Sequence, residues 1–262
     1  MSKNANIHAR EWITSAVATF TINELLNGDR QGWTEDFDWY ILTVVNPDGF
    51  AYTKTTDRLW RKTRTPGTLC MGTDANRNFD FHWRGGGSST DPCSQTYSGP
   101  GVFSEPETQA IRDFIAQINK ELVAYITLHS YGQFILIPFG HNNKPIPQFD
   151  AYMDLGQRIG QATAASYGTN YTVGNGFELL YLFTGSSLDW VKKTYNTNLT
   201  LAYEMRDTGR YGFLLPPEQI IPSAKEFLDG FAVAITELRA GIVTPELPPD
   251  VLHANINQIQ SG

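Results

Sequence analysis

Three stretches of this chain are almost continuously apolar, without the polar alternation of a strand that faces water on one side. Strands buried on both faces are typical of parallel sheets that are covered by helices. The three stretches lie at residues 39–45, 122–128 and 199–203, and a fourth strand is expected at 133–137. Helices are expected between and around them, over residues 14–26, 104–118, 149–167, 188–195 and 223–239. This alternation predicts an α/β fold with a mixed, mostly parallel central sheet flanked by helices.

Three local patterns refine this prediction. Asn46-Pro-Asp-Gly follows the first apolar stretch and predicts a tight turn. Ser104-Glu-Pro-Glu107 resembles a capping box with proline early in the helix. Residues 50–103 are rich in Gly, Ser, Thr and Asn and show little periodicity, and so long a loop in a compact domain is usually functional or disordered. Two cysteines within it favour a functional loop.

The composition fits one large domain. Of 262 residues, 41% are apolar and 13% aromatic, enough for a well-filled core, which we assign to residues 1–242. Pro245, Pro248 and Pro249 and a polar ending predict an extended, mobile tail over 243–262. The 27 carboxylates outnumber 20 Lys and Arg, which argues against binding to nucleic acid. Because no apolar run reaches the length of a membrane span, we expect no membrane binding. We also expect a monomer.

Two histidines and a glutamate form a candidate metal site. His8 and Glu11 stand three residues apart near the start of a predicted helix, so their side chains face the same way. His129 follows an apolar strand, where open α/β sheets place their ligands. Two imidazoles and one carboxylate leave one position of a tetrahedral Zn²⁺ open, as catalytic zinc requires. Taken alone, however, a His-x-x-Glu match is common by chance.

Cys70 and Cys93 lie within the long loop, and a pair at that spacing can close a loop by a disulfide. The alternative is two free buried thiols in a cytosolic protein. The sequons Asn170-Tyr-Thr and Asn198-Leu-Thr permit glycosylation in a secretory route, although Asn198 begins an expected buried strand. Neither sequon alone decides the compartment.

Five segments together resemble one family, the zinc carboxypeptidases of the carboxypeptidase A and B type. They are His8-Ala-Arg-Glu11-Trp, Arg58-Leu-Trp-Arg61-Lys, Asp74-Ala-Asn76-Arg77-Asn, His129-Ser-Tyr and Glu204-Met-Arg-Asp-Thr-Gly-Arg-Tyr-Gly-Phe213. The resemblance keeps their order and runs from about Asn6 to the last helix. It implies that His8, Glu11 and His129 bind one Zn²⁺ per chain, with water as the fourth ligand. It also implies that Asp74 stands behind the first histidine and fixes its tautomer, whereas the alternative for Asp74 is a turn residue.

The resemblance also assigns the catalytic groups. Glu204 matches the general base that takes a proton from the zinc-bound water and later delivers it to the leaving amine. A surface glutamate is the alternative, but Glu204 ends an apolar strand. Arg61 matches the arginine that polarises the scissile carbonyl and holds the developing oxyanion. The alternative for Arg61 is a solvated arginine in a basic cluster.

An exopeptidase of this kind acts on peptides or proteins with a free C-terminus, and a planar guanidinium can grip that carboxylate at two points. Arg77 matches this role, with Asn76 and Tyr181 as helpers. The match of Tyr181 rests on its spacing to Gly185-Ser-Ser-Leu-Asp-Trp. Arg10 matches a position that contacts substrate, but it is equally explained as a structural cation.

Specificity follows from the residue at the pocket floor. In the family an acidic residue at the position of Leu188 goes with Lys or Arg substrates, whereas Leu188 would leave such a cation buried and unpaired. We therefore expect release of C-terminal aliphatic or aromatic residues. Phe183 falls where the family often has a smaller residue, so we expect a shallow pocket for medium-sized side chains.

His82, His141 and His253 match no family role and are expected to be solvated loop residues.

Family members normally begin several dozen residues earlier, with an apolar strand that runs directly into the His-x-x-Glu motif. Residues 1–7 are short and polar, so we expect them not to replace that strand and the fold to be truncated at the N-terminus. The first residues also lack the apolar stretch of a secretion signal, and no propeptide is seen. The resemblance implies an extracellular enzyme nonetheless. The alternative is a catalytically impaired fragment or a binding protein derived from the family.

Overall fold

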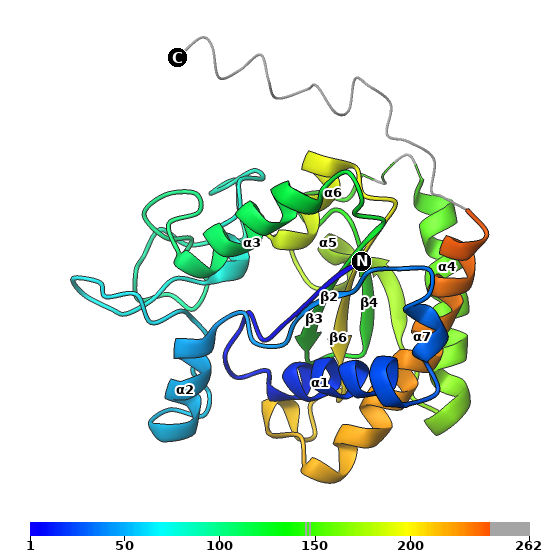
Figure 1. Ribbon diagram of the computed structural model, residues 1–262. Coiled ribbons are helices and arrows are strands. Elements are labelled where there is room, and N and C mark those ends of the chain that lie inside the picture. Colours follow the sequence, from blue (N-terminus) through cyan, green and yellow to red (C-terminus); the bar gives the residue numbers. More distant parts are fainter. Residues whose placement is uncertain (145, 147, 242–262) are drawn as a thin grey trace.

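A six-stranded sheet forms the centre of the computed structural model, which describes residues 1–144, 146 and 148–241 (Figure 1). The strand order is β2-β1-β3-β6-β4-β5, and neighbouring strands are parallel except for the antiparallel pair β4 and β6. The strands are β1 (Ser2–Ala5), β2 (Tyr40–Leu42), β3 (Ala124–Ser130), β4 (Phe134–Ile137), β5 (Thr172–Asn175) and β6 (Leu199–Met205). This sheet confirms the predicted α/β fold. The tail predicted over 243–262 lies outside the described residues.

Helices cover both faces of the sheet (Figure 1). They are α1 (Trp12–Asn27), α2 (Pro47–Thr55), α3 (Pro106–Ile118), α4 (Phe149–Tyr167), α5 (Gly176–Leu179), α6 (Ser187–Tyr195) and α7 (Ile220–Arg239). Four short 3-10 turns add η1 (Gln31–Trp33), η2 (Ala75–Arg77), η3 (Gly212–Leu214) and η4 (Pro217–Gln219). The helices α1, α4 and α7 lie on one side of the sheet, and α3 and α6 lie on the other. Among the described helices, none is long and apolar enough to cross a membrane.

The first residues form an interior strand, which contradicts the expectation that they are too short and too polar for it. Strand β1 lies between β2 and β3 and is buried along its length. Its polar side chains find partners on both faces of the sheet. Lys3 Nζ donates to Thr21 Oγ1 at 2.7 Å, and Asn4 Nδ2 donates to the Tyr125 hydroxyl at 2.9 Å. A polar strand is tolerated in the core because its buried groups are hydrogen-bonded.

Two local expectations were wrong. The Asn46-Pro-Asp-Gly segment begins α2 and is not an isolated turn, because Pro47 occupies the first helical position and the Asn46 side chain caps the helix through the Gly49 N–H at 2.9 Å. The capping box at Ser104 does not form. Glu105 occupies the N-cap position of α3 without a side-chain capping hydrogen bond, and the Ser104 hydroxyl donates to the Glu105 carboxylate at 2.8 Å.

Candidate active site

A tight turn between β1 and α1 carries the first two candidate ligands. His8 and Glu11 lie in this turn, and α1 begins only after Glu11. The buried Asn6 side chain holds the turn, since its Nδ2 donates to the carbonyls of His8 at 3.3 Å and Glu11 at 3.4 Å. Thr14 Oγ1 accepts from the Asn6 N–H at 3.0 Å and donates to the Glu11 carbonyl at 2.7 Å. Hydrogen bonds within the protein thus fix the turn from both sides.

Three buried side chains bring potential ligand atoms together at this turn. His8 Nδ1 lies 2.7 Å from one carboxylate oxygen of Glu11, and His129 Nδ1 lies 3.1 Å from the other. The two histidine Nδ1 atoms are 3.3 Å apart, and all three ligand atoms fall within 4.8 Å of one another. The neighbouring His8 and His129 rings hold the pKa of Glu11 well below its ordinary value, although burial alone would raise it. Two imidazole nitrogens and a carboxylate are the donors that catalytic Zn²⁺ prefers, so these residues could hold that ion.

Asp74 links the candidate metal site to Arg61. Its Oδ1 lies 3.1 Å from His8 Nε2, on the ring nitrogen that faces away from Glu11. Its Oδ2 accepts from Arg61 Nε at 3.1 Å and Nη2 at 2.8 Å. Burial alone would raise the pKa of Asp74, but the charges of Arg61 and His8 hold it well below its ordinary value. An ionised Asp74 can therefore accept from the His8 Nε2–H and leave Nδ1 free for a metal.

Sheet register places Glu204 beside His129. The two residues are paired in the parallel strands β3 and β6, so their side chains project from the same face of the sheet. Both line one pocket at the carboxyl ends of these strands. Burial raises the pKa of Glu204 to about 8, although the nearby His129 opposes this. Glu204 is thus a carboxyl group placed to exchange a proton with a molecule bound at the site.

Arg77 lies in the same pocket, together with Asn76 and Tyr181. Arg77 Nη2 donates to the Tyr181 hydroxyl at 3.0 Å, and Nη1 donates to the Asn76 carbonyl at 2.8 Å. Each of these nitrogens retains a second N–H. Asn76 is fixed by the Ser187 N–H, which donates to its Oδ1 at 3.0 Å. Tyr181 is 49% exposed, so a ligand can reach it from solvent.

The inner part of the pocket is apolar. Leu188, Leu136 and Ala202 form one buried cluster there. Phe183 forms another part of the wall, and its ring packs so closely against Gly140 and Gly176 that a methyl group on either glycine would collide with it. The remaining lining includes the polar residues Thr127, Ser130, Tyr131 and Ser186 and the apolar residues Leu180 and Phe213.

Sequence reasoning missed several residues of this site. Ala202 could have been found from the alternation of side chains along a strand, because it stands two residues before Glu204 and so lies on the same face of the sheet. Asn6 gave no such signal, since its role depends on a turn that only the fold reveals.

Arg10, a candidate from the sequence, lines the pocket, where its guanidinium lies 4.2 Å from the ring centre of Phe213 and donates to the Leu59 carbonyl at 3.3 Å. Arg10 is therefore held by the protein while it faces the pocket.

The two remaining histidines that the structure describes lie in loops, as expected, and His82 is exposed, whereas His141 is partly buried. Their rings stack at a centre distance of 4.2 Å, and Phe81 and Phe139 pack beside His141. Burial, together with the charge of His82, lowers the pKa of His141 to about 4. His141 is thus uncharged at neutral pH and packs in an aromatic cluster. His253 lies outside the described residues.

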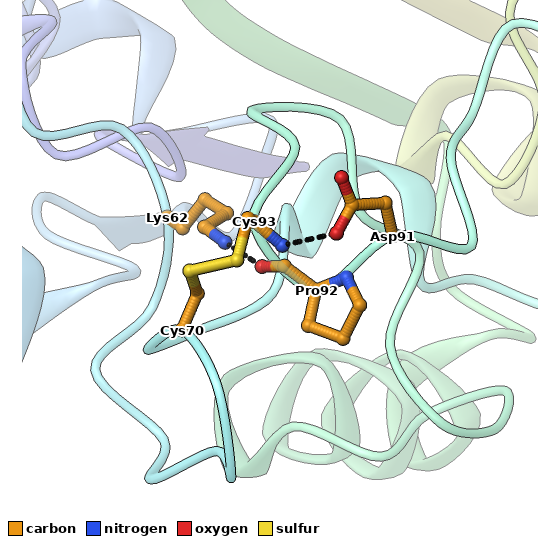
Figure 2. Close-up of a disulfide and its surroundings, with 5 residues drawn as sticks. All are labelled: Lys62, Cys70, Asp91, Pro92 and Cys93. Atoms are coloured by element: carbon orange, nitrogen blue, oxygen red, sulfur yellow. Dashed lines mark hydrogen bonds between the residues drawn. A yellow bond between two sulfur atoms is a disulfide. The ribbon is translucent and has the colours of Figure 1, made fainter.

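Cys70 and Cys93 are joined by a disulfide, as the first of the two alternatives predicted (Figure 2). Neighbouring contacts fix the second half of the loop that the bond closes. The Cys93 N–H donates to the Asp91 carboxylate at 2.9 Å, and Lys62 Nζ donates to the Pro92 carbonyl at 2.6 Å. The loop closed by the disulfide carries Asp74, and the Lys62 hydrogen bond ties its end to the segment that carries Arg61.

Comparison with known proteins gives a consistent result. A family model described as zinc carboxypeptidase matches residues 2–230. A zinc carboxypeptidase of Simulium vittatum is 44% identical over 241 residues, which cover 90% of this chain and 79% of that protein. Zinc carboxypeptidase A 1 of Drosophila melanogaster is 42% identical, covering 90% and 56%, and human carboxypeptidase A1 is 40% identical, covering 85% and 54%. The chain thus spans little more than half the length of the last two.

Solved structures agree with these sequence matches. Bovine thrombin-activatable fibrinolysis inhibitor, solved in complex with tick carboxypeptidase inhibitor, superposes with a TM-score of 0.89 at 36% identity, covering 92% of this chain and 82% of that one. Carboxypeptidase A from Helicoverpa armigera superposes with a TM-score of 0.83 at 33% identity, covering 91% and 61%.

Proposed function

The chain belongs to the zinc carboxypeptidase family, and we propose that it hydrolyses the C-terminal peptide bond of peptides and proteins and prefers apolar C-terminal residues. One observation carries the proposal: a single pocket contains the three converging ligand atoms, Glu204 beside them, and Arg77 with Tyr181. A metal-binding end and a carboxylate-binding end in one pocket are what a metal-dependent exopeptidase requires.

Each polar side chain has a distinct task in the proposed reaction. Bound zinc would supply Lewis acidity and bring the pKa of a bound water toward neutrality. Glu204 would take the proton from that water and deliver it to the leaving amine. Arg61 would hold the carbonyl oxygen as it gains charge, from a position that its two hydrogen bonds to Asp74 fix.

Arg77 would restrict hydrolysis to the last peptide bond of the substrate. Its free N–H groups can grip the terminal carboxylate, and Tyr181 and Asn76 hold the guanidinium in place. A peptide anchored at this point would present its last peptide bond to the metal-binding end of the pocket. We expect internal peptide bonds to be poor substrates because they lack the carboxylate.

The wall of the pocket supports apolar specificity. Leu188 is 3% exposed, and a substrate Lys or Arg beside it would be buried without a carboxylate to pair with. The ring of Phe183 narrows the space, which favours medium-sized side chains such as Leu or Val over Trp. The test is a kinetic panel of blocked dipeptides ending in Leu, Val, Phe, Trp, Lys or Arg. Faster cleavage of Trp than of Leu and Val would contradict the narrow pocket, and efficient cleavage of Lys or Arg would contradict apolar specificity.

We also propose that the enzyme acts outside the cell as a monomer with one Zn²⁺. The disulfide between Cys70 and Cys93 supports an oxidising compartment, because disulfides are rare in cytosolic proteins. Zinc content per chain, measured by atomic absorption, and molar mass in solution, measured by light scattering, test the stoichiometry.

Zinc binding and hydrolysis separate this proposal from that of an impaired fragment or binding protein. The purified chain should bind one equivalent of zinc and hydrolyse a blocked dipeptide ending in Phe or Leu. A folded chain that binds no zinc and shows no activity would support the alternative. Circular dichroism distinguishes this result from a simple failure to fold.

A further inference from the structure

Two asparagines stand in sequons, and the fold gives them different surroundings. Asn170-Tyr171-Thr172 lies in the connection between α4 and β5, where Asn170 is exposed. Asn198-Leu199-Thr200 leads into the central strand β6. A folded protein accommodates an N-linked sugar only where the asparagine side chain can point into solvent.

Asn170 meets this condition, because the backbone around it is fixed while its side chain faces water. Its carbonyl accepts from Gln133 Nε2 at 3.0 Å. The next residue, Tyr171, points inward, and its hydroxyl donates to the buried Glu226 carboxylate at 3.2 Å. Thr172, which completes the sequon, is exposed at the start of β5. An extended segment with alternate residues buried therefore directs both sequon side chains outward.

A polar groove adjoins Asn170. It runs between α4 and the segment that enters β5, and its lining includes the exposed side chains of Gln157 and Gln161. Primary amides can donate to and accept from sugar hydroxyls. The groove also borders β5, which ends the strand order, so one of its edges is not paired with any strand in the described part of the chain. An attached oligosaccharide could lie here without disturbing the core.

We propose that Asn170 carries an N-linked oligosaccharide and that its first sugars lie in this groove and shield the open edge of β5. The side-chain amide nitrogen forms a bond to the anomeric carbon of a lipid-pyrophosphate-linked oligosaccharide, which a transferase of the secretory pathway presents. The bond from that carbon to the pyrophosphate oxygen breaks, the lipid pyrophosphate leaves, and the amide nitrogen loses one proton. The modification requires passage through this pathway, as proposed above, but not peptidase activity.

Asn198 is the internal comparison. Leu199 and Thr200 are buried, and the Asn198 carbonyl accepts from the Tyr152 hydroxyl at 3.1 Å. The Thr200 N–H lies 3.3 Å from the same hydroxyl. A sugar at Asn198 would have to fit where β6 enters the core beside α4. Asn198 therefore stays unmodified in the folded protein.

The test is secretion of the full chain from insect cells behind a heterologous signal peptide, followed by intact-mass measurement with and without a peptide-N-glycosidase. We expect the wild type and Asn198→Gln to lose the mass of one oligosaccharide on treatment, and Asn170→Gln and Thr172→Ala to show no change. Peptide mass spectrometry should find Asn170 converted to Asp by the enzyme and Asn198 intact. A secreted wild type without oligosaccharide, or with one at Asn198 alone, would overturn the proposal. Zinc content and peptidase activity, measured on the same samples, report separately on the proposed function.

Hydrogen exchange tests the position of the sugars. Backbone amides of β5 should exchange more slowly in the glycosylated wild type than in Asn170→Gln, whereas those of β2, at the opposite edge of the sheet, should not differ. Equal rates in β5 would show that the oligosaccharide does not cover this edge.

Discussion

The Asp74 carboxylate lies 3.1 Å from His8 Nε2, on the opposite side of the imidazole from Glu11. Asp74 is completely buried and is held ionised by Arg61 and His8. It can therefore fix both the tautomer and the orientation of the His8 ring. Since the same carboxylate also binds Arg61, it couples the metal end of the pocket to the cation proposed to stabilise the oxyanion.

Asp74→Asn should weaken zinc binding by about 10- to 100-fold, because the amide is a poorer acceptor for the His8 Nε2–H. Competition with a chromogenic chelator measures this change. Asp48→Asn, at an exposed position in the first turn of α2, is the matched control and should leave zinc affinity unchanged. Equal zinc affinity in Asp74→Asn and wild type would show that Asp74 does not support the histidine.

Glu204→Gln should lower kcat by about a thousandfold, because glutamine cannot accept the proton of the attacking water. Zinc content should not change, since Glu204 is not one of the three converging ligands. Steady-state hydrolysis and atomic absorption on one preparation give both values. Glu178→Gln, in the short helix α5, serves as the control. Near-normal kcat in Glu204→Gln would remove this residue from the proposed chemistry.

Arg77→Lys should impair recognition of the terminal carboxylate, because an ammonium group keeps the charge but not the planar two-point grip. The ratio of kcat/KM for a peptide with a free C-terminus to that for its C-terminal amide should fall about tenfold or more. Tyr181→Phe removes the hydroxyl that Arg77 donates to and should have a smaller effect in the same direction. Arg84→Lys, whose guanidinium donates to the Gly99 carbonyl outside the pocket, should not change the ratio. An unchanged ratio in Arg77→Lys would place carboxylate recognition elsewhere.

Phe183→Leu should widen the pocket and raise the relative kcat/KM for Trp over Leu by about tenfold, within the range that one pocket contact supplies. Leucine retains much of the apolar packing against Gly140 and Gly176, so the fold should survive. Phe139→Leu, in a buried ring outside the pocket lining, controls for general loosening of the core. If both variants show the wild-type preference, Phe183 does not set the width.

Asp189→Asn should flatten the dependence of stability on pH. Burial raises the pKa of Asp189 from its ordinary value of 3.8 to about 7, and its Oδ2 accepts from the Gly140 N–H at 2.9 Å. Between these two pH values the folded state retains a proton that the unfolded chain has lost, so this group lowers stability as pH rises. The variant should lose less stability over that interval, by up to about 4 kcal/mol in the free energy of unfolding. Urea unfolding of metal-free protein at several pH values measures the free energy of unfolding of both proteins. Parallel plots of this free energy against pH for variant and wild type would refute the role assigned to Asp189.

Elements governed by local patterns were predictable from the sequence. The helix expected over 149–167 coincides with α4, which ends at Gly168 in the left-handed conformation that glycine favours. Strand β1 was not predictable, because Lys3 and Asn4 are compatible with burial only through Thr21 and Tyr125, which the sequence places far away. The Asn46-Pro-Asp-Gly segment fits a turn and a helix start equally well by local rules.

Only part of the candidate site could likewise be predicted from the sequence. The residue types and spacing of His8 and Glu11, with His129 after an apolar strand, suggested a metal site, and the resemblance to a family added Glu204 and Arg77. No local pattern indicated the Asn6 contacts that shape the turn, or the stacking of His82 on His141. These depend on which distant segments the sheet brings together.

The pairing of His129 with Glu204 makes the proposed catalytic arrangement a property of strand alignment as much as of side-chain identity. If β6 slipped by one residue against β3, Tyr203 or Met205 would take the place of Glu204 and the carboxyl group would project from the opposite face. No intermediate alignment keeps the acid–base group half in place. Hydrolysis should therefore vanish completely in any misregistered form. Residual activity in a destabilised preparation would then be proportional to the fraction of molecules in which β6 and β3 are correctly aligned.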